Sequence, residues 1–328
     1  MNELLQVKDL KKYYPVTKGL LKKEVASVKA VDGVSFTIRE GETFGLVGES
    51  GCGKTTVGKM VVRLLDPTAG EILFRGQDIV TLKKAELLQL RKEIQIIFQD
   101  PYGSLNPRMT IHDIIAEPIK KHHLAEGEEI TRQVIDLLNR VGLSERELRK
   151  YPHEFSGGQR QRVCIARALA VKPKLIVCDE PVSALDVSVQ SQVLNLLKDL
   201  QRDLGIAYLF IAHGMPVVRH MSDRVGVMYL GQLVEVAECE ELFSNRLHPY
   251  TQALISAIPI ADPDHIPNRI VLEGDVPNPI NLNPGCRFYS RCPYATEHCK
   301  DTPPQLKEIR PGHYVACHKV DQEMSPQG

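Results

Sequence analysis

A glycine-rich segment at residues 48–55 constrains this chain more than any other feature. It reads Gly-Glu-Ser-Gly-Cys-Gly-Lys-Thr, follows a short apolar run and leads into a helical pattern at residues 55–65. Glycines let backbone N–H groups wrap closely around phosphate oxygens, and a helix N-terminus favours an anion. The segment therefore predicts a strand, a phosphate-binding loop and a helix, the Walker A arrangement. A glycine turn with a chance lysine is the alternative, and the flanking strand and helix disfavour it.

Two side chains at the end of this loop have distinct expected duties. Lys54 supplies a mobile positive charge for the β- and γ-phosphates of a nucleotide, and Thr55 supplies a hydroxyl for Mg²⁺. The residues of this segment that we expect to bind ATP are Gly48, Glu49, Ser50, Gly51, Cys52, Gly53, Lys54, Thr55 and Thr56.

A second apolar run, at residues 175–180, ends in two carboxylates, Asp179 and Glu180. Carboxylates at a buried strand end are costly unless a metal or a catalytic duty compensates. Taken alone, the pair could be a solvated strand end. Because the chain also holds a phosphate loop, we expect Asp179 to hold Mg²⁺ through water and Glu180 to polarise the attacking water.

Short apolar runs elsewhere set the fold class. Runs at residues 94–98, 207–213 and 225–231 read as buried strands, separated by helical stretches such as 187–204. This alternation predicts an α/β fold with a mostly parallel sheet covered on both faces. Residues from about 100 to 170 carry helical periodicity and indicate an inserted helical subdomain.

Near the N-terminus, two segments read as antiparallel strands, and the Lys-rich stretch between them, residues 15–30, reads as a surface loop.

One further motif identifies the class. Residues 155–159, Phe-Ser-Gly-Gly-Gln, precede a strongly periodic helical stretch. Here the chain resembles the ABC ATPase family, whose signature is LSGGQ, with Phe155 in place of Leu. Ser156 can cap the following helix and reach a γ-phosphate. Two phosphate-binding helix starts in one chain suggest ATP sandwiched between two subunits, whereas a flexible Ser-Gly linker would not lead into such a helix.

Other landmarks of that family follow in order. Gln99 matches the Q-loop glutamine, residues 183–186 match the D-loop, and His213 matches the switch histidine. His213 is followed by Gly214, where relatives usually carry an acidic residue. Tyr14 is the expected adenine-stacking aromatic, with Tyr13 as the less favoured choice.

The resemblance covers residues ~5–245 and implies an ABC-type P-loop NTPase core with an antiparallel β subdomain. It also implies roles for individual residues. These are Glu180 and His213 in catalysis, Thr55, Gln99 and Asp179 at Mg²⁺, Tyr14 and Gln99 at ATP, and Ser156, Gly157, Gly158, Gln159 and Asp186 at the ATP of the partner subunit.

The cargo follows only from a narrower resemblance. Residues 248–259, 285–299 and 313–318, together with the stretch 100–108, resemble the dipeptide/oligopeptide importer ATPases. This implies a second ABC ATPase subunit, identical or homologous, two membrane permease subunits and, indirectly, a peptide-binding protein. It also implies a place on the cytoplasmic face of the membrane. A nickel or other small-solute importer and a soluble, non-transport ABC ATPase remain alternatives.

Charge and hydropathy agree with that picture. Lys plus Arg and Asp plus Glu are 41 each, which argues against a general nucleic-acid binder. No apolar run approaches the ~20 residues that span a bilayer, and the first residues lack the pattern of a secretory signal. We expect a cytosolic protein with an ABC ATPase domain at residues 1–247 and a C-terminal extension at 248–328.

The extension carries a cluster of four cysteines. Their spacing, with five, six and seventeen residues between them, matches neither a zinc ribbon nor a common ferredoxin run. Within the family resemblance such a tail implies a [4Fe–4S] cluster, while Zn²⁺, free thiols and disulfides stay open. The expected ligands are Cys286, Cys292, Cys299 and Cys317.

Overall fold

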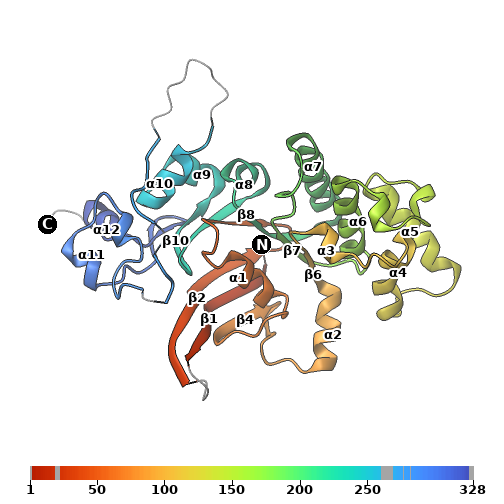
Figure 1. The fold of residues 1–328 in the computed structure, drawn as a ribbon, viewed down its shortest axis with the longest axis horizontal. Helices are drawn as coiled ribbons and strands as arrows, with labels where there is room; N and C mark the ends of the chain where they lie inside the picture. The colour runs from red at the N-terminus through yellow and green to blue at the C-terminus, as the bar shows by residue number, and fades with distance from the viewer. Residues whose placement is uncertain (1, 19–22, 260–268, 276, 281, 325–328) are drawn as a thin grey trace.

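The computed structural model describes residues 2–18, 23–259, 269–275, 277–280 and 282–324. Figure 1 shows an elongated molecule with a central sheet, helices α4 and α5 at one end of the long axis, and α11 and α12 at the other. Within the described residues, none of the helices combines the length and apolar character that crossing a membrane requires.

The central sheet has eight strands in the described part of the chain. In spatial order they are β11 (Lys307–Arg310), β12 (His313–Val315), β10 (Gln232–Glu238), β9 (Arg224–Tyr229), β3 (Thr43–Val47), β8 (Ala207–Ala212), β7 (Leu175–Asp179) and β6 (Ile94–Ile97). The five strands from β9 to β6 are parallel to their neighbours, and β10, β12 and β11 add antiparallel pairs at one edge. The predicted α/β class is confirmed.

Both faces of this sheet are covered, which explains why its strands are apolar throughout. Along β7, Ile176 and Cys178 point into one hydrophobic core, and Leu175 and Val177 point into the other. Alternate residues of a strand face opposite sides, so a strand buried on both faces needs a continuous apolar run. Helices α6 (Gly157–Leu169), α7 (Val187–Leu204) and α8 (Met215–Met221) contribute to the first core, and α1 (Lys54–Val61) to the second.

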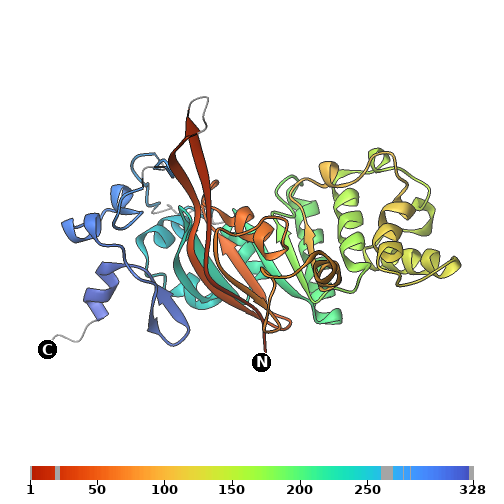
Figure 2. The same cartoon turned by 90° about the horizontal axis from the view of Figure 1, so that it is seen from below.

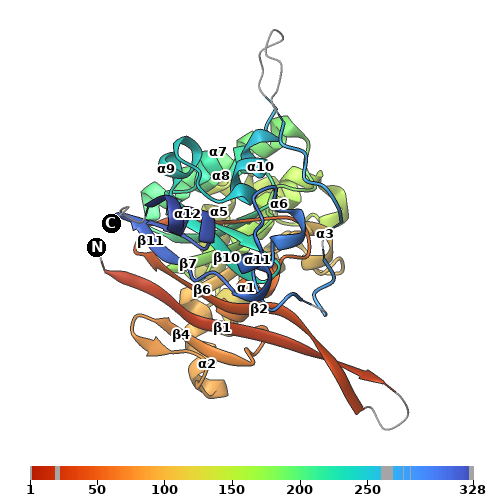
Figure 3. The ribbon, with the colours of Figure 1, turned by 90° about the vertical axis from the view of Figure 1, so that its left-hand side faces the viewer.

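A second, antiparallel sheet lies beside the core, as predicted. Its order is β2 (Lys23–Arg39), β1 (Glu3–Lys18), β4 (Ala69–Phe74) and β5 (Gln77–Asp78). The interpretation of residues 15–30 as a surface loop was wrong, because Val16 pairs with Ala26 and both strands continue beyond them. Residues 19–22 lie outside the described part. Figure 3 shows the resulting long hairpin extending past the rest of the sheet.

Residues 101–169 form helices without a strand among them. They are α3 (Pro101–Ser104), α4 (Ile111–Lys121), α5 (Glu128–Arg140), the 3-10 turns η1 (Glu145–Glu147) and η2 (Pro152–Glu154), and α6. This segment leaves the sheet after β6 and returns at β7, and α2 (Lys84–Glu93) leads into β6. Figure 1 shows α6 well away from α1.

The C-terminal segment, by which we mean the described residues from Cys239 onward, is attached to the core rather than separate from it. It contains α9 (Cys239–Ser244), α10 (Pro249–Ser256), η3 (Tyr289–Arg291), α11 (Glu297–Asp301) and α12 (His318–Met324), besides β11 and β12. Val315 of β12 pairs with Glu235 of β10, so the cysteine-bearing segment extends the main sheet. Figure 2 shows the C-terminal segment at one end of the molecule and the helices of residues 101–169 at the other, with the sheet between them.

A fully buried carboxylate fixes this attachment. Glu235 accepts hydrogen bonds from the backbone N–H groups of Leu247 (2.7 Å) and His248 (3.0 Å), and its Oε1 lies 2.8 Å from Nε2 of His313. Burial alone would lower the pKa of His313, but the hydrogen bonds to Glu235 and Glu241 outweigh it and raise that pKa. Breaking one member of such a buried set leaves the others unsatisfied.

We therefore expect Glu235→Ala to lower the free energy of unfolding by about 3–5 kcal/mol, measured by urea denaturation. Glu240→Ala is the matched control. Glu240 pairs with Arg219 on the surface, and its loss should change the free energy by less than about 1 kcal/mol. Equal, small losses in the two variants would contradict the anchoring role of Glu235.

Candidate functional site

The phosphate loop connects β3 to α1, where the sequence placed it. Gly48 and Gly53 have φ angles of 150° and 105°, in the region that disfavours side chains. A Cβ on Gly48 would lie 2.1 Å from the carbonyl oxygen of Met228, and one on Gly53 would lie 2.2 Å from that of Ala30. Both positions require glycine because the neighbouring backbone approaches so closely.

The start of α1 is open to an anion. Its N-cap residue, Gly53, makes no side-chain cap, and the first turn holds no acidic residue. The first N–H groups of a helix have no partner within the helix, and they carry the positive end of its dipole. Ser50 and Gly51 form the exposed tip of the loop, and the half-buried Thr55 and Thr56 begin the helix. This geometry suits a phosphate group.

Lys54 is the most buried charge of the loop, with 4% of its surface exposed. Its Nζ donates to the carbonyl oxygens of Gly48 (2.8 Å) and Glu49 (3.0 Å) and lies 3.6 Å from Sγ of Cys52. Among the described residues no carboxylate forms an ion pair with it. An ammonium held by neutral carbonyls keeps its attraction for an added anion.

Asp179 lies at the carboxyl end of β7, beside Thr55. The hydroxyl of Thr55 donates to Oδ1 of Asp179 at 2.8 Å. Burial raises the pKa of Asp179, and the Thr55 hydrogen bond and nearby lysines oppose that rise. A hydroxyl and a carboxylate oxygen are ligands that Mg²⁺ accepts, and Mg²⁺ commonly uses one or two such protein groups plus substrate phosphates. The residues present therefore fit this ion.

Glu180 stands between two of the other predicted residues. Its Oε2 accepts from Nε2 of Gln99 at 2.7 Å, and its Oε1 lies 2.5 Å from Nε2 of His213. Nδ1 of His213 lies 3.4 Å from Nζ of Lys54. With Nε2–H donating to Glu180, Nδ1 is the nitrogen that can accept from Lys54. One hydrogen-bonded chain thus joins Gln99, Glu180, His213 and Lys54.

The backbone at Glu180 is strained. Its φ angle is 50°, in the left-handed region that a side chain rarely adopts, and its N–H donates to the carbonyl of Ile211 at 3.0 Å. Such conformations persist where the surroundings enforce them, often at functional sites. The turn after β7 directs the carboxylate back toward β8, where His213 begins the next loop.

The predicted signature residues form a different surface. Ser156 caps α6, and its hydroxyl accepts from the N–H of Gln159 at 3.3 Å. The tight packing of α6 on α7 requires glycine at position 158, since a Cβ on Gly158 would lie 2.4 Å from Cγ1 of Val189. A Cβ on Gly157 would lie 3.3 Å from the Leu185 side chain, a close contact that this side chain can relieve by a small shift. Asp186 is exposed at the start of α7. The contacts of Ser156 and Gln159 in the described structure do not reach the phosphate loop.

The two candidate aromatics for adenine differ in their surroundings. Tyr14 is 40% exposed on β1, with Nζ of Lys12 located 5.3 Å from the ring centroid. The hydroxyl of Tyr13 donates to Asp32, and burial and this contact raise its pKa to about 12. Tyr14 therefore keeps an accessible ring face, which stacking on a base requires.

One pair of contacts at the loop was not foreseen. Arg291 forms a two-point ion pair with Glu49, and the hydroxyl of Tyr250 accepts from the backbone N–H of Glu49 at 2.9 Å. Both partners come from the C-terminal segment, about 200 residues away along the chain. No spacing pattern in the sequence links residues so far apart.

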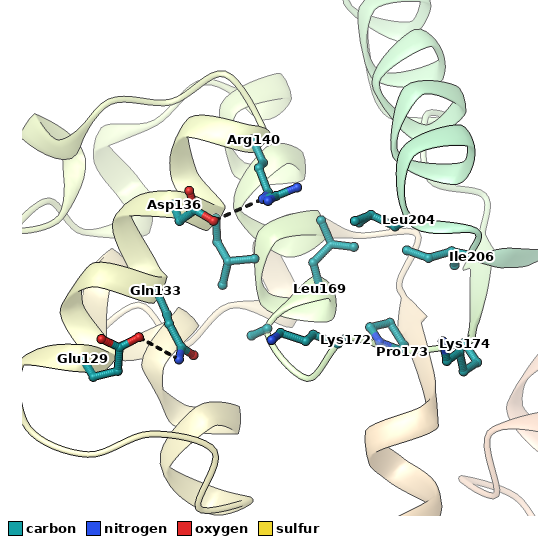
Figure 4. Close-up of a pocket in the computed structure, with 12 residues that line it drawn as sticks. Glu129, Gln133, Asp136, Arg140, Leu169, Lys172, Pro173, Lys174, Leu204 and Ile206 are labelled. Carbon is teal, nitrogen blue, oxygen red and sulfur yellow. Dashed lines mark hydrogen bonds and ion pairs between the residues drawn. The ribbon is translucent and has the colours of Figure 1, made fainter.

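A cavity of about 410 Å³ lies elsewhere, between α5 and the turn that enters β7. Figure 4 shows Asp136 and Arg140 of α5 on one side, and Leu204 and Lys174 on the other. Lys174 precedes β7, and Asp179 ends it, so the cavity lies at the opposite end of this strand from the phosphate loop. It takes no part in the site described above.

Comparison with known proteins identifies the family. A family profile described as ABC transporter matches residues 31–183, and one described as Oligopeptide/dipeptide transporter, C-terminal region, matches residues 234–299. The oligopeptide transport ATP-binding protein AppF of Bacillus subtilis is 53% identical over 96% of this chain and 97% of its own length. The chain belongs to the dipeptide/oligopeptide family of ABC transporter ATP-binding subunits.

A second member of this family and a solved ATP-binding cassette support the same family assignment. The putative oligopeptide transport ATP-binding protein YkfD of Bacillus subtilis is 52% identical over 96% of this chain and 95% of its own. Among solved structures, the dimeric post-hydrolysis state of the ATP-binding cassette MJ0796, bound to ADP and Pi, is 30% identical with a TM-score of 0.64, covering 72% of this chain and 98% of that one. As an ABC ATP-binding subunit, the chain is an ATPase.

The prediction of a [4Fe–4S] cluster was wrong. The described residues contain no group of three or more His, Cys, Asp or Glu side chains that could hold a metal ion, and the structure has all four cysteines as free thiols. Burial raises the pKa of Cys286 to about 12 and also raises those of Cys292 and Cys317. The tail cysteines are therefore not arranged as a set of metal ligands in the described structure.

The alternative of Zn²⁺ at the same cysteines fails for the same reason. The four cysteines line a cavity of about 20 Å³ together with apolar and aromatic side chains and with His248, His318 and Lys319. Hydrophobic contacts add to the hydrogen bonds of Glu235 in holding this segment to the core, since Phe288, Val315 and Val320 are buried.

Proposed function

We propose that this chain is the ATP-hydrolysing subunit of an importer for dipeptides or oligopeptides. The single observation that supports a peptide cargo is the sequence similarity to relatives named for oligopeptide transport. This similarity extends along nearly the whole chain, including the tail. The subunit would work at the cytoplasmic face of the membrane, with a second ABC ATPase subunit and two permease subunits. A peptide-binding protein would act with it indirectly, and nucleic acid is not a partner.

We propose the same division of the chain that the sequence suggested. Residues 1–247 would form the ABC ATPase domain, with a helical subdomain at about 100–170, and residues 248–328 the C-terminal extension. The two family profiles, which match residues 31–183 and 234–299, support two units without fixing the boundary.

We assign the phosphates of ATP to the loop of residues 48–56. Its glycines allow close approach, the start of α1 offers N–H groups, and Lys54 offers a positive charge that carries no ion pair in the described structure. Tyr14 would stack on adenine. Thr55 and Asp179, with Gln99 nearby, would hold Mg²⁺, which when bound supplies positive charge to the β- and γ-phosphate oxygens.

Hydrolysis would depend on Glu180. Glu180 is 5% exposed, and Gln99 and His213 orient its carboxylate. The carboxylate can therefore accept a proton from a water placed between it and the γ-phosphate. His213 would position Glu180 through Nε2–H and contact the γ-phosphate region beside Lys54. Gly214 caps α8 with an ordinary φ of −84°, so the missing acidic side chain leaves the backbone after His213 regular.

Glu180→Gln should reduce the turnover number by about 10²–10⁴-fold, the usual contribution of a general base. Affinity for MgATP should stay within about threefold, because Lys54 and Thr55 keep their contacts. Steady-state hydrolysis and equilibrium nucleotide titration measure the two quantities. Glu240→Gln, a surface carboxylate, serves as the control. Turnover at the wild-type rate by the purified Glu180 variant would contradict this role.

We propose that Ser156, Gly157, Gly158, Gln159 and Asp186 bind the ATP held by a partner subunit. Ser156, Gly157 and Asp186 are exposed at the starts of α6 and α7, with Gln159 half-buried and Gly158 buried beside them. In Figure 1 these two helices lie apart from α1, which follows the loop of their own chain. An exposed helix start with a Ser-Gly-Gly cap is a second anion site. A second copy related by twofold symmetry would bring each such surface to the other chain's loop, giving two shared sites.

This arrangement can be tested in the Glu180→Gln background, where bound ATP is retained. The Glu180→Gln chain should dimerise on adding MgATP, seen by sedimentation velocity. Adding Ser156→Arg should keep the chain monomeric, because the arginine blocks the exposed helix start, while MgATP affinity stays within about threefold. Dimerisation of the double variant as complete as that of Glu180→Gln alone would rule out the shared site.

A further inference from the structure

The side chain of Glu49, the second residue of the phosphate loop, forms an ion pair with an arginine of the C-terminal segment. Nη1 of Arg291 donates to Oε2 of Glu49 at 2.8 Å, and Nη2 donates to Oε1 at 3.2 Å. A guanidinium paired with a carboxylate through two parallel hydrogen bonds fixes both distance and orientation. The Arg291 side chain is 8% exposed and that of Glu49 is 29% exposed. The ion pair is therefore well shielded without being sealed from water.

The backbone of Glu49 is held as well. Its N–H donates to the hydroxyl of Tyr250 at 2.9 Å. Tyr250 is fully buried, and its ring lies 4.7 Å from that of Tyr229 and 5.5 Å from that of Phe288, measured between centroids. Because Phe288 belongs to the C-terminal segment and Tyr229 to the core strand β9, this aromatic group gives the Glu49 contacts a rigid base.

Glu49 in turn contacts the group that we assign to phosphate binding. Its carbonyl oxygen accepts from Nζ of Lys54 at 3.0 Å. The loop tip itself, Ser50 and Gly51, is exposed, and a Cβ placed on Gly51 would meet nothing within 4 Å. Because Ser50 and Gly51 are exposed, the position of the loop depends on the residues on either side of them, and Glu49 directly precedes them.

The other end of the loop is tied to the same segment. Arg287 donates to the carbonyl oxygen of Leu230 and to Asp32. Gly231, which follows Leu230 in the chain, donates its N–H to the carbonyl oxygen of Cys52 at 2.9 Å. Its own carbonyl oxygen accepts from the N–H of Asp32 at 2.8 Å. Arg291 thus contacts the start of the loop directly at Glu49, whereas Arg287 acts on its end indirectly, through Leu230 and the neighbouring Gly231 that binds Cys52.

We propose that the segment 287–291 positions the phosphate loop for ATP, with Arg291 as a positioning residue that acts through Glu49. This rests on the proposed assignment of the loop as the site of the ATP phosphates. Arg291 does not touch the nucleotide. It restricts the loop to the conformation in which Lys54 and the first N–H groups of α1 converge, so that less ordering is left for ATP to impose.

The first test compares two arginines of the C-terminal segment in the full chain. Arg291→Gln should weaken MgATP binding about tenfold, equal to about 1.4 kcal/mol, as measured by titration with a fluorescent ATP analogue. Arg310→Gln is the matched control, because Arg310 pairs with Glu241 at 3.3 Å, away from the loop, and its affinity should stay within twofold. Arg291→Lys should fall between them, since an ammonium cannot reproduce the two-point contact.

A purely structural role gives a different pattern. If Arg291→Gln lowers the urea midpoint as Arg310→Gln does and leaves MgATP affinity within twofold of wild type, the proposal is overturned. Failure of the wild-type chain itself to bind MgATP would instead contradict the proposed function of the loop. The two failures are therefore distinguishable from one set of titrations.

A double-mutant cycle tests the route through Glu49. Glu49→Gln should weaken MgATP binding about as much as Arg291→Gln, and the double variant should be no weaker than either alone, because the contact is already lost. Losses that multiply in the double variant would show that Arg291 acts by another path and would overturn the proposal.

Discussion

The buried ammonium of Lys54 is the interaction on which the rest of the site depends. It holds the carbonyl oxygens of Gly48 and Glu49, so the loop closes around a positive charge. His213 lies beside it and carries the link onward to Glu180. A charge buried this deeply is costly unless it has partners, and neutral carbonyls satisfy its hydrogen bonds without neutralising it. The loop, the carboxylate of Glu180 and the imidazole of His213 are therefore organised around one cation.

The parallel sheet is what brings these groups together. β3, β7 and β8 are neighbours that run in the same direction, so Gly48, Asp179 and His213, which follow or end them, meet at one edge. The same packing requires glycine at Gly48, and the backbone at Glu180, directly after β7, is left-handed. The site thus derives its geometry from the sheet, whereas the C-terminal segment reaches it from the side through Arg291 and Tyr250.

Local chemistry made much of this predictable from sequence. The phosphate loop, the paired carboxylates after an apolar strand and the Ser-Gly-Gly helix start each carry a pattern over a few residues, and the fold class followed from the alternation of strands and helices. Long-range contacts carry no such pattern, so the Arg291–Glu49 ion pair and the pairing of β12 with β10 were missed. Of the Lys-rich stretch 15–30, residues 15–18 and 23–30 continue two paired strands, because an exposed hairpin tolerates lysine. The family resemblance implied a metal cluster at the tail cysteines, but the described residues contain no group of side chains that could hold a metal ion.

A crystal structure of this chain with Mg²⁺ and a non-hydrolysable ATP analogue tests the central assignment most directly. We expect the β- and γ-phosphates within hydrogen-bond distance of Nζ of Lys54 and of the first N–H groups of α1, with Mg²⁺ bound by the hydroxyl of Thr55. Phosphates bound elsewhere, with Lys54 still held only by the carbonyl oxygens of Gly48 and Glu49, would contradict the assignment.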